Sequence, residues 1–319
     1  MERDPQTPHG VFVGLATLDI VQRVRDLPKR NTKVTALQQD IAAGGPALNA
    51  AVVFAKLGGR ATLMTRLGDG QVSSLIRDDL DSHGVEVMDV AEPHFHPAVS
   101  TISIDDTTGD RQIVSTDARG GSDAPDRPGR RNVQGLSDAL ESMEPTKLVH
   151  LDGHHPDLAL AAARWGKQLG VPRVVDAGRW KPVMRDLVAL ATDVVCSADF
   201  RVPDQSTALT SWIVSQGVDL AAVTNGPEPV QWKMGSAEGA VPVEHAPVVD
   251  TLGAGDFFHG AYSFARTFRD GNGRPVDPVA CLQFASHIAT MRCASTGTRR
   301  WLDGIGKSSL VEFFGRVRR

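Results

Sequence analysis

Short apolar runs alternate with helical segments along much of the chain, and this alternation constrains the fold more than any other feature. After Leu148, "LVHLDG" is typical of a strand, "PDLALAAARWGKQLG" of a helix, "RVVDAG" of a strand, "KPVMRDLVALA" of a helix and "DVVCSA" of a strand. Strands separated by helices form a parallel sheet that is covered on both faces. We therefore predict a doubly wound α/β fold, with a first strand in "GVFVGLATLDI" that ends near Asp19.

The middle of the chain departs from this alternation. "AVSTISIDDTTGDRQIVSTD" places two β-rich runs around a cluster of turn residues, which is typical of a hairpin, and the earlier "KVTALQQDIA" is also strand-like. Because these pieces lack intervening helices, we predict a small separate sheet. The sequence thus indicates one α/β domain over residues 10–315, with a β lid formed by about residues 20–42 and 97–118.

The charge of the chain argues against a polyanionic partner. Its 319 residues carry a net charge of −4 and give a pI of about 6.2, so we expect neither nucleic acid nor an anionic membrane as a partner. The three cysteines are too few and too scattered for a disulfide framework or a zinc site. The N-terminus is polar, and no apolar run approaches the roughly 18 residues that span a bilayer. These features predict a soluble cytoplasmic protein.

Candidate binding residues follow the predicted strands, because ligands of open α/β sheets bind beyond the carboxyl ends of the strands. Asp19 ends the first predicted strand, and a glycine pair opens an alanine-rich helix that contains Asn49. Thr224 and Gly226 follow a later strand, and residues 253–256 open another helix. The sequence predicts that these segments supply the site.

The stretch "DTLGAGDFFHG" carries the strongest chemical signal. A helix N-terminus exposes unpaired N–H groups and the positive end of the helix dipole, so it binds anions, and small residues let an oxyanion approach the amides. Asp256 would lie beside that anion. Because the two negative charges repel each other, a carboxylate at this position calls for a chemical task. Accepting the proton of a hydroxyl that attacks a phosphoryl group is such a task. The alternative is that Asp256 only complements the dipole and the glycines only form a turn.

Three motifs, "DTLGAGD", "GGPALNAAVVFAKLG" and "TRLGDG", resemble the two signature regions of the PfkB (ribokinase-like) carbohydrate kinases. Matching pieces extend from about Val11 to about Gly297. Within the family, "VGLATLDIV" and "VVDTLGAGDFF" are similar to ketohexokinase-like members, and "GGPA" and "GAGDFFHGA" to sulfofructose kinase-like members. The resemblance implies a ribokinase-like fold with a small β lid, and transfer of a phosphoryl group from ATP to an alcohol group of a small carbohydrate.

The same resemblance implies roles for individual residues. Asp256 matches the base that takes the proton from the phosphorylated hydroxyl. Three small residues match the anion hole that holds the γ-phosphate: Gly253, Ala254 and Gly255. Three others match positions that hydrogen-bond sugar hydroxyls: Asp19, Gly45 and Asn49. Thr224 and Gly226 match the loop on the nucleotide side.

The predicted hairpin resembles the family's lid, which in ketohexokinase-like relatives also makes the dimer contact, so the resemblance implies a homodimer. Asn31 falls where such relatives have a lid residue that reaches the sugar of the neighbouring subunit. Arg111, on the hairpin, is either a solvated lid charge or a contact for an anionic group of the substrate.

Two departures from the family pattern bear on ligands. The stretch "VVCSADFRV" lacks the Asn-x-x-Glu element that many ribokinase-like enzymes link to Mg2+ and phosphate. Ketohexokinase-like relatives lack it too, so the resemblance implies ATP and Mg2+, with room for a monovalent cation such as K+, but assigns no residue to a metal. Pro46 stands where ketohexokinase has a sugar-contacting Asn, and a proline supplies neither a side-chain hydrogen bond nor an N–H. Sulfofructose kinase has a proline there, so a modified sugar, or one that resembles a phosphorylated sugar, is an alternative substrate.

We therefore expect an ATP-dependent sugar kinase that acts on a ketose or ketose-like substrate. Two alternatives remain: a nucleoside kinase, and a catalytically silent sugar-binding regulatory protein of the same fold. "GIGKSS" lacks the first glycine of a P-loop and is interpreted as a helix cap. The histidine pairs "HFH" and "HH" have no third metal ligand at a useful spacing and are interpreted as loop residues.

Overall fold

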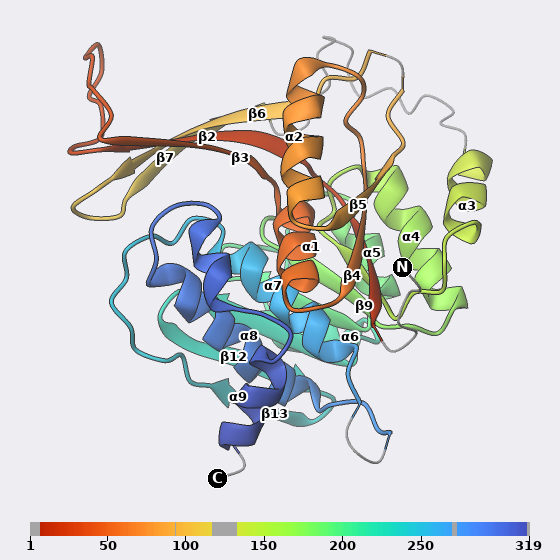
Figure 1. Cartoon of the computed structure of the whole chain (residues 1–319). Coiled ribbons are helices and arrows are strands. Elements are labelled where there is room, and N and C mark those ends of the chain that lie inside the picture. Colours follow the sequence, from red (N-terminus) through yellow and green to blue (C-terminus); the bar gives the residue numbers. More distant parts are fainter. Residues whose placement is uncertain (1–6, 93, 117–132, 270–272, 318–319) are drawn as a thin grey trace.

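A nine-stranded sheet forms the body of the protein (Figure 1). The computed structural model describes residues 7–92, 94–116, 133–269 and 273–317. The spatial order of the strands is β13-β12-β11-β10-β9-β8-β1-β4-β5. The strands from β11 to β5 run parallel, whereas β12 and β13 join as an antiparallel edge. The bounds are β1 His9–Val13, β4 Arg60–Thr65, β5 Val85–Asp89, β8 Leu148–Leu151, β9 Arg173–Ala177, β10 Asp193–Ser197, β11 Leu220–Asn225, β12 Glu228–Met234 and β13 Ala237–Val241.

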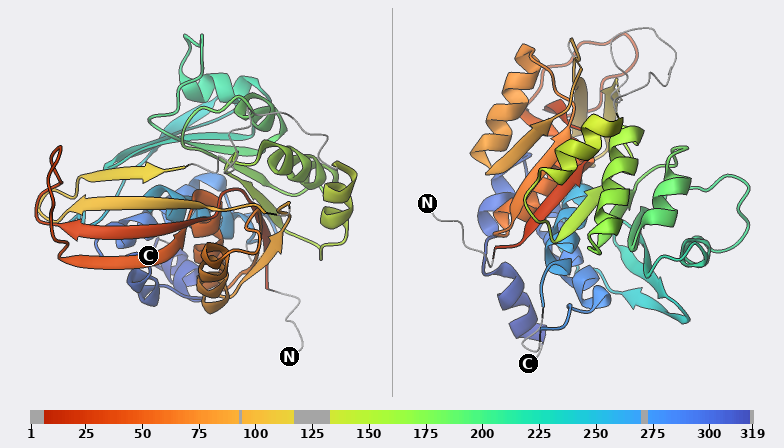
Figure 2. Two further views of the ribbon diagram at one scale, coloured as in Figure 1. Left: turned by 90° about the horizontal axis from the view of Figure 1, so that it is seen from above. Right: turned by 90° about the vertical axis from the view of Figure 1, so that its right-hand side faces the viewer.

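Helices cover both faces of this sheet (Figure 2). One apolar core holds side chains of α1 (Pro46–Lys56), α2 (Gln71–Ser82), α7 (Ala254–Arg266), α8 (Pro278–Cys293) and α9 (Ser309–Val317). The other core holds side chains of α3 (Val133–Glu141), α4 (Pro156–Gln168), α5 (Met184–Leu190) and α6 (Leu209–Ser215). A short 3-10 helix, η1 (Arg300–Gly304), precedes α9. The predicted doubly wound α/β fold is confirmed, because parallel strands buried on both faces carry the two cores.

A separate four-stranded sheet forms the lid, which projects from the body in Figure 1. Its order is β3-β2-β6-β7, with the bounds β2 Thr17–Val24, β3 Gln38–Gly44, β6 Ala98–Asp105 and β7 Arg111–Ser115. The strands β2 and β6 pair in parallel, and the other two pairs are antiparallel. The small separate sheet predicted from the sequence is therefore present. Residues 117 and 118 of its expected extent lie outside the described residues.

The prediction that the first strand ends near Asp19 is wrong. The strand β1 ends at Val13, and Asp19 lies on β2 of the lid. The chain leaves the main sheet after Val13, and the next residue must be glycine, because a Cβ at Gly14 would lie 2.0 Å from a carboxylate oxygen of buried Asp152. The other carboxylate oxygen of Asp152 accepts from the Leu15 N–H at 2.9 Å. This junction carries Asp19 off the body and onto the lid.

The helices α1 and α7 pack closely, and this contact builds the site. The helix α1 starts after Gly45, which has a φ of 106°. A Cβ on Gly45 would lie 2.4 Å from the Leu15 carbonyl oxygen, so the position excludes other residues. Pro46 occupies the first turn of α1, where a missing N–H costs nothing. On α7, a Cβ at Gly260 would lie 2.5 Å from the Ala50 carbonyl oxygen of α1, so the two helices approach backbone to backbone.

Within the residues described, no helix combines the length and the apolar character needed to cross a membrane.

Candidate functional site

The N-termini of α1 and α7 meet at the base of the lid. Asn49, in the first half of α1, donates from Nδ2 to Oδ2 of Asp256 at 2.8 Å. Asp256 lies in the first turn of α7 and is half-buried. Two residues predicted to serve the sugar and the transferred proton are thus in direct contact.

Asp256 has the electrostatic surroundings of a base that titrates near neutrality. Burial raises its pKa to about 7, and the negative charges of Asp176 and Asp19 act in the same direction. The hydrogen bond from Asn49 and the nearby His259 oppose this rise. A carboxylate with a raised pKa holds a transferred proton more firmly, which suits general-base catalysis near pH 7.

The start of α7 presents free amides. Its N-cap, Gly253, is left-handed with a φ of 74°. The Ala254 N–H turns back to the Thr251 carbonyl at 3.2 Å, so the next two amides, those of Gly255 and Asp256, are the ones without an intrahelical partner. A Cβ at Gly255 would meet nothing within 4 Å. Unpaired amides at a helix N-terminus, with nothing crowding Gly255 on its Cβ side, fit an anion.

Asp19 reaches the site from the lid strand β2. A Cβ at Gly44 would lie 2.0 Å from Asp19 Oδ2, so the carboxylate lies directly over the glycine pair before α1. Burial raises the pKa of Asp19, while hydrogen bonds from Thr17 and Ser100 and the charge of Arg299 lower it. The Thr17 hydroxyl donates to Asp19 Oδ1 at 2.7 Å. Asp19 and Gly45 thus border the same space as Asn49.

The inner face of the lid contacts the loop that leads into α7. Arg111, on β7, donates from Nη1 to the Thr251 hydroxyl at 2.6 Å. Arg23, on β2, lies 3.0 Å from Asp250 Oδ2 through its Nη2. Leu252 packs against three buried lid side chains: Val21, Ile102 and Ile104. Arg111 is therefore tied to the loop before the α7 amides and is not only a solvated charge.

Asp250 is buried between two arginines. Besides Arg23, Arg292 of α8 places Nη2 3.0 Å from Asp250 Oδ2. Nη1 of Arg292 donates to the backbone carbonyls of Asp250 at 3.3 Å and Ser295 at 2.8 Å. Arg292 is fully buried. The loop before α7 is thus held from the lid side and from the body side.

The remaining predicted residues lie apart from this cluster. Asn31 has a φ of 60° and is exposed in the loop between β2 and β3. None of the described contacts joins Asn31 to the site of its own chain. Thr224 is at the end of β11, where its hydroxyl donates to the Cys196 carbonyl at 3.2 Å, and Gly226 forms the turn into β12 with a φ of 55°.

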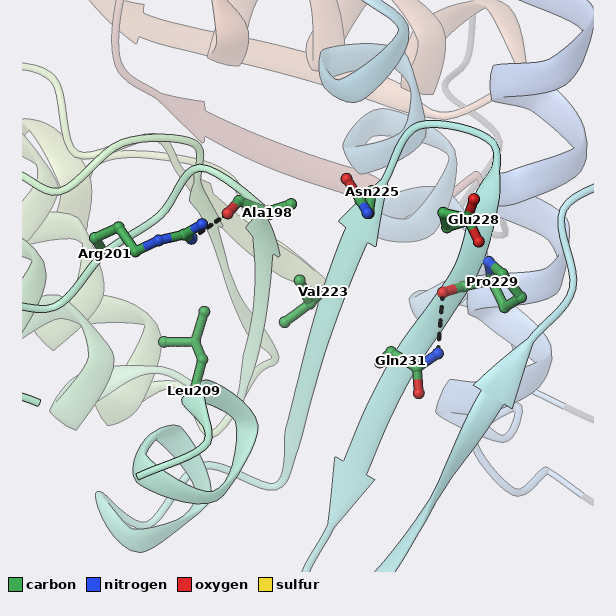
Figure 3. A pocket seen from close by; sticks show the side chains of 8 residues that line it. All are labelled: Ala198, Arg201, Leu209, Val223, Asn225, Glu228, Pro229 and Gln231. Carbon is green, nitrogen blue, oxygen red and sulfur yellow. Dashed lines mark hydrogen bonds between the residues drawn. The ribbon is translucent and has the colours of Figure 1, made fainter. Parts of the chain in front are cut away.

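A cavity of about 390 Å³ lies beside the end of β11 (Figure 3). Its lining includes Val223, Asn225 and, on the neighbouring loop, Arg201. Because side chains alternate along a strand, Thr224 points to the other face, the one covered by α7 and α8. That face also holds Ala222, the preceding residue on the same side. The cavity in Figure 3 is therefore separate from the Asp256 cluster.

Three ionisable residues of the site were not predicted from the sequence: Asp176, His259 and Arg299. Asp176 on β9 lies 3.5 Å from Nδ1 of His259, one turn after Asp256 on α7. Both ring nitrogens of His259 also face carbonyl oxygens, those of Gly255 at 2.6 Å and Val195 at 3.2 Å. Asp176 was visible in "RVVDAG" as an acid at the end of a strand. Arg299, which contacts Asn49 at 3.0 Å, had no such local signal.

The described residues contain no group of three or more His, Cys, Asp or Glu side chains that could hold a metal ion.

Comparisons with known proteins identify the family and the fold of the chain. A family model described as "pfkB family carbohydrate kinase" matches residues 8–303. The chain is similar to the ribokinase of Bacillus subtilis, with 24% identity over 90% of this chain and 93% of the relative. It is also similar to the ketohexokinase of Mus musculus, with 25% identity over 92% of this chain and 97% of the relative. The structure of Arabidopsis thaliana ribokinase complexed with ribose and ATP aligns with a TM-score of 0.70, at 22% identity over 96% of this chain and 98% of that one.

Proposed function

Because the chain belongs to the pfkB family of carbohydrate kinases and is thus a phosphotransferase with an alcohol acceptor, we propose that it transfers the γ-phosphate of ATP to a hydroxyl of a ketose or ketose-like sugar, with Asp256 as the base. The observation that carries this proposal is the contact between Asn49 and Asp256 at the open N-terminus of α7. The proposed sugar-binding amide of Asn49 then contacts the proposed base, Asp256, and the amides of the proposed anion site belong to Asp256 and its neighbour Gly255.

The proposed reaction uses each group for one task. Asp19, Asn49 and the backbone at Gly45 hold sugar hydroxyls, since a carboxylate accepts from two hydroxyls and an amide both donates and accepts. Asp256 accepts the proton of the attacking hydroxyl. The amides of Gly255 and Asp256, together with Gly253 and Ala254 as the turn that aims them, stabilise the charge on the migrating phosphoryl group.

The nucleotide would lie along the ends of β10 and β11, with its phosphates at α7. Thr224, on the same face of β11 as the core residue Ala222, and Gly226, in the turn after β11, would border that path. Mg2+ bound with ATP would neutralise phosphate charge, and we assign it no direct protein ligand. The lid would close over the sugar and exclude water, which limits wasteful hydrolysis of ATP.

An exposed row that includes two large apolar side chains on the outer face of the lid is consistent with the proposal of a homodimer. One row of side chains crosses the four strands on the outer face of the lid. Its members are successive partners in the strand register: Ile41, Ile20, Thr101 and Val114. Ile41 is 56% exposed and Val114 is 71% exposed. A second copy that covers this row would remove both side chains from water. In such a dimer the loop containing Asn31 would contact the neighbouring sugar site, as the family resemblance implies.

A kinase screen tests the proposal. ADP release is measured with fructose, sulfofructose, tagatose, ribose, a sugar phosphate and adenosine, with the Asp256→Asn variant as the blank for each. We expect turnover with a ketose that the variant lacks. Turnover only with adenosine would replace the proposal by a nucleoside kinase, and tight sugar binding with no turnover at all would replace it by a silent binding protein.

A further inference from the structure

We propose that Arg299 is a positioning residue: it fixes the side-chain amide of Asn49 so that the N–H group, and not the carbonyl oxygen, faces Asp256. This inference rests on the proposed function, in which Asp256 is the base. Nη1 of Arg299 donates to Oδ1 of Asn49 at 3.0 Å, and Nδ2 of Asn49 donates to Asp256 Oδ2 at 2.8 Å. The three side chains form a relay that spans 250 residues of sequence.

The chemistry of the groups leaves one orientation for this relay. A guanidinium has donors only, so the atom of Asn49 that faces Arg299 must be the carbonyl oxygen. The amide nitrogen then faces Asp256, and an ionised carboxylate has acceptors only. With Arg299 removed, the amide can turn over when Asp256 is protonated and accept from its O–H, so the protonated form gains a hydrogen bond that the Arg299 contact denies it.

Three further hydrogen bonds hold the Arg299 guanidinium in place. Its Nη2 donates to the Ala43 carbonyl of β3 at 2.6 Å and to Asp79 Oδ2 of α2 at 3.1 Å, and its Nε lies 3.3 Å from the same Asp79 oxygen. Its side chain is 14% exposed. The planar fork of a guanidinium suits several fixed acceptors at once, and a lysine ammonium does not. Arg299 therefore offers Asn49 a donor that cannot rotate away.

The relay acts on a base in acidic surroundings. Asp256 is faced by Asp19 from β2 and Asp176 from β9, which favour its protonated form, and by His259 from its own helix, which opposes them. The Asn49 N–H is the hydrogen bond that favours the ionised form. Loss of that bond would leave a larger share of Asp256 protonated and unable to accept a proton at neutral pH.

The test measures the titration of Asp256 directly and needs no sugar. Carboxyl carbons of aspartate are labelled with 13C, and the Asp256 signal is identified by its absence in Asp256→Asn. In Arg299→Met we expect its midpoint to rise by about one pH unit, which is a roughly tenfold smaller ionised share at low pH. An unchanged midpoint would overturn the inference. Arg60→Met is the matched control, since it removes another arginine with an ion pair, to Glu144, from the amino end of β4.

Two further variants separate positioning from charge and from misfolding. Arg299→Lys keeps the positive charge and the pairing with Asp79, and we expect it to fold and to show the rise seen in Arg299→Met. In an Asn49→Ala background, Arg299→Met should add no further rise, because the relay is already broken. An additive rise in that double variant, or a wild-type midpoint in Arg299→Lys, would overturn the relay. The base assignment fails separately, if Asp256→Asn retains turnover.

Discussion

Nδ2 of Asn49 lies 2.8 Å from Oδ2 of Asp256, although 207 residues separate the two in the sequence. The close packing of α1 on α7, allowed by Gly260, brings them together. This contact joins a residue predicted to hold the sugar to the residue predicted to accept its proton. Asn49 is therefore expected to influence the protonation of Asp256 as well as sugar binding.

Asp256→Asn should abolish most turnover while the fold survives. The amide is similar in shape but cannot accept the proton, and general acid–base catalysis contributes roughly 10²–10⁴-fold. We expect kcat to fall by that factor with little change in sugar affinity, measured by steady-state kinetics and calorimetry. Near-normal kcat in this variant would rule out Asp256 as the base.

The rate should rise with pH through neutrality. Asp256 acts only when it is ionised, and burial raises its pKa to about 7, so kcat/KM should fall about tenfold per pH unit well below that value. Asp176→Asn removes a negative neighbour, which lowers the pKa of Asp256 and should move the acidic limb to lower pH. In Arg299→Met the pKa of Asp256 should rise, which moves the acidic limb to higher pH. A profile flat from pH 5 to about 8 would contradict this account.

Two glycine substitutions at the start of α7 should separate stability from activity. At Gly253 the φ of 74° and the Phe257 ring, 3.0 Å from a Cβ, penalise alanine, so Gly253→Ala should cost on the order of 1–2 kcal/mol of unfolding free energy. Gly255 is helical with open space around it, so Gly255→Ala should stabilise by up to about 1 kcal/mol. The new methyl would nevertheless occupy the proposed phosphate space and lower kcat. Urea unfolding and kinetics measure both; an active, stabilised Gly255→Ala would argue against the anion site.

Asp250→Asn should destabilise the protein strongly. The change leaves Arg292, which is fully buried, without its carboxylate, and breaking a buried pair costs about 3–5 kcal/mol. Glu238→Gln is the control, because its pair with Lys233 is at the surface and such pairs contribute little to stability. Urea unfolding of both variants measures the difference. Equal losses of unfolding free energy in the two variants would show that the ion pairs of Asp250 do not stabilise the loop before α7.

Val114→Lys should weaken the dimer without weakening the fold. Val114 ends the exposed row on the outer lid face and is 71% exposed, and a buried lysine charge opposes association. Val311→Lys, on α9, is a matched control, since Val311 is 69% exposed and lies outside the lid. Light scattering across a range of concentrations should show a shift to monomer for Val114→Lys only. A wild-type protein that stays monomeric at high concentration would remove the dimer from the proposal.

Local pattern was sufficient for most of the elements. The parallel core, the β6–β7 hairpin and the helix α7 that follows residues 250–253 all depend on periodicity and turn chemistry within a few residues. The antiparallel edge formed by β12 and β13 was not predicted, although Asn225 and Gly226 are a typical turn pair for such a hairpin. Asp19 was assigned to the wrong sheet, because the junction after β1 contacts Asp152, which lies far away in the sequence.

The sequence by itself determined the doubly wound order of elements, the glycine-rich start of α7 and the residue types that chemistry requires there. Only the tertiary structure decided which charges face Asp256: Asp176 from β9, His259 one turn along α7, and Arg299 acting through Asn49. The reason is physical. Hydrogen bonds and Coulomb interactions act over a few ångströms of space, and separation along the chain does not predict that distance, whereas helix and strand patterns arise from neighbours in the chain itself.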